Sequence, residues 1–130
     1  MKRYPDPITS PEIVRQVCAD YATKRQERVA ILTLDASGRL VRRRVVSLGT
    51  ANSAAVHARD VFYGAIRDNA VSIIAVHNHP SGQVTPSTED NAMTSNLRDA
   101  GRLLGIPLRD HVIVGRLGFF SYQQAGLMTG

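Results

Sequence analysis

Two histidines, His77 and His79, follow an apolar run at residues 73–76 and could together bind a metal ion. Residues two apart on an extended strand project to the same side, so both imidazoles can address one point. Ser87 and Asp90 follow at the expected start of a helix, and their spacing of three places both on one helix face, where either could supply an oxygen ligand. Three protein ligands with one open position describe a catalytic zinc site.

The cysteine content narrows the kinds of metal site that this chain can build. Cys18 is the single cysteine of the sequence, which excludes an internal disulfide and a zinc site made of cysteines. Any transition metal must therefore be held by histidine and carboxylate side chains. We expect Cys18 itself to be a small buried residue on a helix.

Length and composition predict one domain over residues 1–130. A chain of 130 residues with 43% hydrophobic content can bury one core and is too short for two. No segment approaches the roughly 18 to 20 apolar residues that span a bilayer, and the start, MKRYPDPITSPE, lacks the apolar core of a signal peptide. These features predict a cytoplasmic protein.

The positive charge is concentrated in the first part of the chain. Residues 1–50 contain 10 Lys and Arg against 5 Asp and Glu, whereas the remainder contains 6 of each kind, for a net charge of +5. Arg42, Arg43 and Arg44 lie in one expected strand and cannot all face a core. They predict an exposed sheet edge whose charges discourage strand addition, with a weak nucleic-acid contact as the alternative.

The order of expected elements predicts an α/β domain with helices on both sides of a mixed sheet. A hairpin and a helix precede the central strand, which is expected directly before His77 and whose continuous apolar character predicts burial on both faces. Ser10 and Pro11 suit the start of the first helix, and Gly105 suits the end of the last one. The expected strands are 28–34, 39–48, 71–76, 110–115 and 119–122, and the expected later helices are 58–69 and 87–104.

The residues around the histidines carry a resemblance to a known family. The spacing His77-x-His79, seven residues, Ser87, two residues, Asp90, with a Glu upstream, resembles the JAMM signature of JAB/MPN-domain metalloproteases. The stretch AVHNHPSGQVTPSTEDNAMTSNLRDAGRLLGIPLRDHVIVG is similar to the bacterial RadC family, historically labelled DNA repair proteins. The resemblance extends over residues 8–122.

This resemblance implies a cytidine-deaminase-like α/β/α domain with zinc at the end of a central strand. It implies that His77, His79 and Asp90 bind the zinc, that Glu27 is the general acid/base, and that Ser87 supports the tetrahedral intermediate. The implied substrate is a peptide or isopeptide bond. Longer members of the family carry an N-terminal helix-hairpin-helix region, for which there is no room before residue 8.

Each of these roles has a simpler alternative. Glu27 lies in the charged run KRQER, where a solvated carboxylate is the default, and it can take a proton at the site only if the first strand lies beside the third. Ser87 fits a helix N-cap as well as an oxyanion donor, although Thr85 is an equally suitable cap and would release Ser87. Asp90 could simply favour the positive end of its helix.

Other functional classes fit the sequence less well than a metallopeptidase. His77-Asn78-His79 spells the letters of an HNH nuclease, but that class spreads its motif along a hairpin. A zinc deaminase needs a His-x-Glu and a Cys-x-x-Cys pair, which one cysteine cannot supply. The serious alternative to a peptidase is a RadC-like DNA-repair-associated or protein-interaction module with a structural or vestigial zinc site. The complete set of ligands together with Glu27 favours the peptidase.

Overall fold

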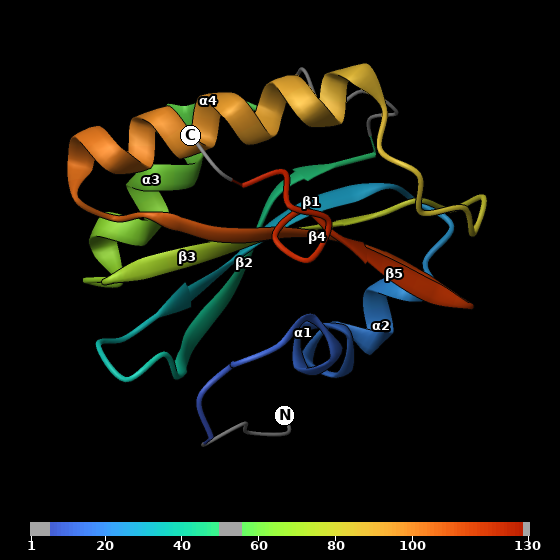
Figure 1. Ribbon diagram of the computed structural model, residues 1–130, viewed down its shortest axis with the longest axis horizontal. Coiled ribbons are helices and arrows are strands. Elements are labelled where there is room, and N and C mark those ends of the chain that lie inside the picture. The colour runs from blue at the N-terminus through green and yellow to red at the C-terminus, as the bar shows by residue number, and fades with distance from the viewer. Residues whose placement is uncertain (1–5, 50–55, 129–130) are drawn as a thin grey trace.

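The computed structural model describes residues 6–49 and 56–128, and within them a five-stranded sheet has helices on both faces (Figure 1). The strand order is β2-β1-β3-β4-β5. Strands β3 and β4 are parallel and the other neighbours are antiparallel, so the sheet is mixed as predicted. In chain order the elements are α1 (Pro11–Val17), α2 (Ala19–Ala22), β1 (Arg28–Leu34), β2 (Leu40–Leu48), α3 (Ala58–Arg67), β3 (Ser72–Asn78), α4 (Thr88–Leu104), β4 (Leu108–Gly115) and β5 (Gly118–Ser121).

Two apolar layers sandwich the sheet, with α1 and α2 on one face and α3 and α4 on the other (Figure 1). Alternation along β1 shows how one strand serves both layers. Ala30 and Leu32 pack on the side of α1 and α2, whereas Val29 and Ile31 pack on the side of α3 and α4. The predicted α/β/α arrangement is therefore confirmed.

Strand β3 lies in the middle of the sheet, as its apolar run predicts, and all seven of its residues are buried. It extends two residues past the predicted end, so that His77 and Asn78 belong to the strand. β1 pairs with β3 in antiparallel register, with Val29 opposite His77. The first strand therefore lies beside the third, which is the condition that the proposed role of Glu27 requires.

Helix α4 begins with a capping box formed by Ser87 and Asp90. The Ser87 hydroxyl accepts from the Asp90 amide at 3.1 Å, and the Asp90 carboxylate accepts from the Ser87 amide at 2.9 Å. The suggestion that Thr85 caps this helix is thus wrong, because the chain enters the helix only after Ser87. A side-chain cap stabilises a helix by about 1 kcal/mol. Gly105 ends α4 in the left-handed conformation, with φ of 73°, as predicted.

The first predicted helix is divided in two at Cys18, which takes φ of −111° and ψ of 26° between α1 and α2. Apolar residues at helical spacing continue across the break, since Val14, Val17 and Tyr21 are all buried. Burial raises the pKa of the Cys18 thiol to about 12, so this side chain is a neutral packing group.

The exposed edge strand β2 carries its arginines largely in ion pairs. Arg43 contacts Asp20 at 2.7 Å, and Arg44 contacts Asp68 at 2.6 Å. Arg42, with 63% of its side chain exposed, lies 3.9 Å from Asp68. Charged side chains on an edge strand discourage the addition of another strand, so edge protection stays the prediction for these arginines. Within residues 6–49 and 56–128, no helix has the length and apolar character needed to cross a membrane.

Candidate metal centre

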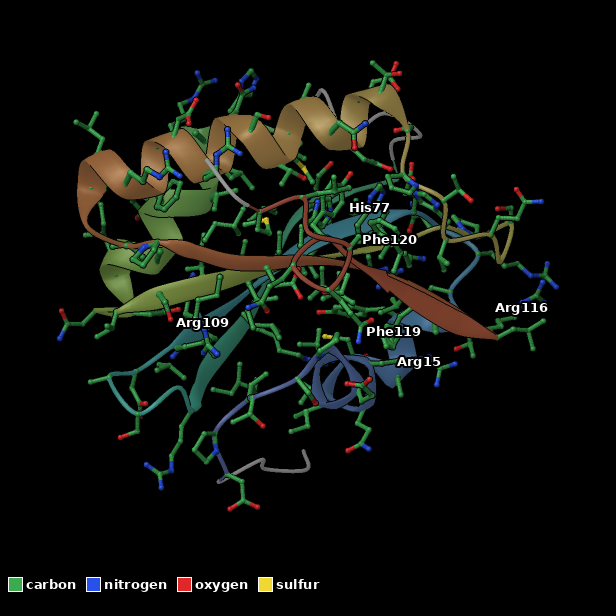
Figure 2. The ribbon with its side chains drawn as sticks, viewed as in Figure 1. Arg15, His77, Arg109, Arg116, Phe119 and Phe120 are labelled. Carbon is green, nitrogen blue, oxygen red and sulfur yellow. The ribbon has the colours of Figure 1, made fainter. Side chains whose placement is uncertain are left out.

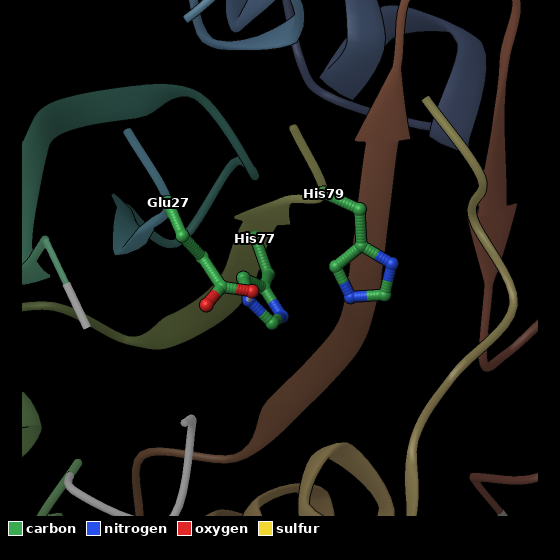
Figure 3. Close-up of side chains that lie close together, drawn as sticks. All are labelled: Glu27, His77 and His79. Atoms are coloured by element: carbon green, nitrogen blue, oxygen red, sulfur yellow. Dashed lines mark hydrogen bonds and ion pairs between the residues drawn. The ribbon is translucent and has the colours of Figure 1, made fainter. Parts of the chain in front are cut away.

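His77 lies near the end of β3 and His79 directly follows the strand, and both imidazoles face Asp90 of α4. Figure 2 shows His77 between α4 and the sheet, and Figure 3 shows its imidazole beside the carboxylate of Glu27 and the imidazole of His79. One ligand atom from each of Glu27, His77 and His79 lies within 4.8 Å of the other two. The strand geometry that the sequence predicts therefore brings both histidines to one point.

Asp90 comes to the same point from the first turn of α4. Its carboxylate is 1% exposed, with Oδ1 3.2 Å from His77 Nδ1 and Oδ2 3.2 Å from His79 Nε2. In a tetrahedral site with bonds of 2.0–2.1 Å, two ligand atoms are separated by about 3.3 Å. Asp90 is therefore at ligand-to-ligand distance from both imidazoles, as the third member of a metal shell would be.

The hydrogen bonds of His79 leave one ring nitrogen directed at the site. His79 Nδ1 lies 2.9 Å from the Gln83 carbonyl oxygen, which can only accept, so Nδ1 carries the proton and Nε2 faces Asp90. Histidines that bind metals commonly have their second nitrogen held in this way. The loop after β3 thus fixes the tautomer that metal binding needs.

The carboxylate of Asp90 remains an anion at neutral pH. Burial alone would raise its pKa, but the neighbouring imidazoles of His77 and His79 and the Ser87 amide together hold the pKa of Asp90 well below its usual value. The same contact with Asp90 raises the pKa of His79. The site therefore places a fixed negative charge where a cation would be bound.

His77 lies between two carboxylates and is not satisfied by protein contacts alone. Its Nε2 is 2.7 Å from Glu27 Oε1, whereas its buried Nδ1 has no hydrogen-bond partner within the described part of the chain despite the nearby Asp90. A buried imidazole nitrogen without a partner is unfavourable, and a bound metal ion would give it a partner. Two imidazoles and carboxylates fit zinc, so the residues present suit the implied metal.

Glu27 approaches the site from the residue before β1, and its side chain is 15% exposed. The 2.7 Å contact with His77 places Glu27 beside the candidate ligands, whereas Lys24, Arg25 and Gln26 of the KRQER run are exposed. The distance of Glu27 from the imidazoles is compatible with metal binding as well as with proton transfer.

Comparison with known families agrees with this geometry. The family model of the RadC-like JAB domain matches residues 8–127. The chain belongs to this family. The match covers every helix and strand described above and all the residues of the candidate metal centre.

Curated relatives of this RadC-like domain are named UPF0758 protein, a name that states no activity. The chain is 40% identical over 126 residues to the one from Thermotoga maritima, covering 97% of the chain and 57% of the relative. It is 44% identical over 124 residues to the one from Staphylococcus carnosus, covering 92% and 53% respectively. The chain therefore spans little more than half the length of the relatives that it matches.

Ser87 is an exposed residue whose hydroxyl caps α4 beside Asp90. A hydroxyl accepts through its oxygen and donates through its hydrogen, so accepting from the Asp90 amide leaves the Ser87 hydrogen able to donate to another group. The N-cap role and the implied oxyanion role are therefore compatible in this RadC-like domain.

Sequence reasoning missed a support behind Asp90, formed by Thr94 and His111. The Thr94 hydroxyl donates to the Asp90 carbonyl oxygen at 2.9 Å and lies 2.6 Å from His111 Nδ1. With its one hydrogen already donated, Thr94 must accept from a protonated Nδ1. Burial lowers the pKa of His111 to about 3, so this ring is neutral. The position of Thr94, four residues after Asp90, was the available signal, since it lies on the same helix face.

Proposed function

We propose that this RadC-like domain is a zinc-dependent hydrolase of the JAMM type that cleaves a peptide or isopeptide bond. The observation that supports the proposal is the convergence of His77, His79 and Asp90 at one end of the sheet, with Glu27 within hydrogen-bond distance of the first imidazole. Two imidazoles and one carboxylate with an open fourth position are a recurring ligand set of zinc hydrolases. When bound, zinc supplies Lewis-acid activation of a water molecule near neutral pH.

In this proposal the side chains divide the work between metal binding and proton transfer. His77, His79 and Asp90 hold the zinc. Glu27 accepts a proton from the attacking water and then returns it to the leaving amine nitrogen, so one carboxylate serves both steps. The Ser87 hydroxyl donates a hydrogen bond to the oxygen that gains negative charge. The partial exposure of Glu27 lets it face both the site and an incoming substrate.

The proposal predicts zinc-dependent cleavage of peptides. Zinc-loaded domain incubated with a peptide mixture and with isopeptide-linked substrates should produce new termini, measured by mass spectrometry, and a chelator should stop their appearance. A DNA-repair-associated or protein-interaction module with a structural or vestigial zinc site is the alternative. Zinc-loaded, folded domain that cleaves none of these substrates would favour that alternative.

The arginines of β2 are the candidate contact for nucleic acid, and we propose at most a weak, salt-sensitive contact. Since Arg43 and Arg44 are ion-paired with Asp20 and Asp68, the more exposed Arg42 is the better placed to meet a phosphate. Fluorescence anisotropy with labelled duplex DNA at low salt should show little binding, and Arg42→Ala should reduce it. Tight binding whose salt slope falls by about three when all three arginines become Ala would contradict this expectation.

A further inference from the structure

Asn78 stands between the two histidines but faces the opposite side of β3, because successive strand residues alternate. It is 1% exposed and points toward the connector between α2 and β1. Its Oδ1 accepts from the Arg28 amide at 2.7 Å. Its Nδ2 lies 3.2 Å from the Gln26 carbonyl oxygen and 3.4 Å from that of Lys24, and donates to both. One buried side chain is thus bonded to two carbonyl groups of this connector and to the first amide of β1.

These bonds bracket Glu27 on both sides along the chain. The ladder between β1 and β3 ends at the pair of Val29 with His77, and the Asn78 amide replaces ladder hydrogen bonds beyond that point. Residues 23–26 are exposed, so apolar packing contributes little to their position. The Gly49 amide donates to the Glu27 carbonyl oxygen at 2.9 Å from the side of β2. Glu27 is therefore fixed chiefly by polar contacts with its backbone and its neighbours.

We propose that Asn78 is a positioning residue that holds segment 24–28 so that the Glu27 carboxylate reaches the metal centre. The inference rests on the proposed function of Glu27 as the proton acceptor. Asparagine suits the task because one amide supplies both an acceptor for the Arg28 amide and two donors for the carbonyls. Strand β3 thereby presents His77 on one face, while Asn78 on its other face holds the segment that carries Glu27.

Hydrogen exchange of the backbone amides in segment 24–28 tests this role, in Asn78→Ala and Asn78→Asp variants. Asn78→Ala should speed exchange of the Arg28 amide about tenfold or more, because its acceptor is lost. Asn78→Asp keeps an acceptor, so the Arg28 amide should stay protected, while the bonds to Lys24 and Gln26 are lost. Zinc content should equal that of the parent in both variants, since neither change touches a ligand.

The kinetic readout separates positioning from general stability. With a cleaved substrate, kcat should fall in Asn78→Ala by at least tenfold at nearly constant KM, and should fall less in Asn78→Asp. Asp35→Ala is the control, since Asp35 accepts from the Ser37 and Arg39 amides at the opposite end of β1. This variant should lose protection at its own turn and keep the parent's zinc content, kcat and exchange at 24–28.

Two results would overturn the role of Asn78. They are unchanged exchange across 24–28 in folded Asn78→Ala, and loss of zinc from that variant at the same protein stability. If Asn78→Ala does not fold, Asn78→Asp decides the question through kcat, since an unchanged value would show that the two lost donors do not position Glu27. Exchange and zinc content need no substrate, so a parent that cleaves nothing refutes the proposed function without altering these readouts.

Discussion

A His77→Ala variant should lose zinc binding and peptide cleavage together. The imidazole of His77 lies between the carboxylates of Asp90 and Glu27. Its removal takes away one proposed ligand and leaves these two negative charges without the ring that separates them. Loss of an outer-shell partner typically costs 10- to 100-fold in metal affinity, and loss of a ligand should cost more than about 100-fold. Zinc titration monitored by calorimetry measures the change directly.

His57→Ala provides the matched control for this experiment. His57 is an exposed histidine at the start of α3 that makes no side-chain capping bond. Its replacement should leave zinc affinity and cleavage at the parent values. Retention of parent zinc affinity in folded His77→Ala would show that the metal centre is not where the proposal places it.

A Glu27→Gln variant should keep its zinc and its thermal stability and lose most of its activity. The amide preserves the shape of the side chain but cannot take a proton from water, and His77, His79 and Asp90 remain to hold the metal. A positioned acid/base contributes ~10² to 10⁴ in rate, so kcat should fall by that factor. Metal analysis and steady-state kinetics on the same preparation give both values.

Glu12→Gln, at an exposed position in α1, is the control and should behave as the parent. Loss of zinc from Glu27→Gln would make Glu27 a ligand, a role that its distances from His77 and His79 permit. Full activity in this variant would show that Glu27 is not the proton acceptor. The two failures are distinct, because the first changes metal content and the second does not.

The fold was predictable where local pattern and burial agree. The apolar run before His77 predicts a central strand, and the structure confirms that position in the sheet. The end of the strand was less predictable, since His77 and Asn78 are polar and are buried only because they contact other segments. The break at Cys18 was missed because the apolar spacing of the first helix continues across it.

The candidate metal centre was likewise predictable only where its geometry depends on residues that are close in the sequence. Strand alternation predicts that His77 and His79 address one point, and helix spacing places Ser87 and Asp90 on one helix face, because both are properties of neighbouring residues. The family resemblance was needed to single out Asp90 as the candidate third ligand. The support from Thr94 and His111, by contrast, links α4 to β4, which is distant along the chain. Asn78 carried no signal of its own, since its three backbone partners belong to a segment some 50 residues earlier.

Titration of zinc into the metal-stripped chain at pH 7.5 and at pH 5.5 tests whether His77, His79 and Asp90 form a zinc site. About one zinc per chain should bind at pH 7.5, because His77 and His79 can then bind as neutral imidazoles beside the ionised Asp90. Protons compete for these nitrogens as the pH falls, and the raised pKa of His79 strengthens that competition, so binding should be mostly lost below about pH 6. Folded protein that takes up no zinc at pH 7.5 would show that these residues do not form a zinc site.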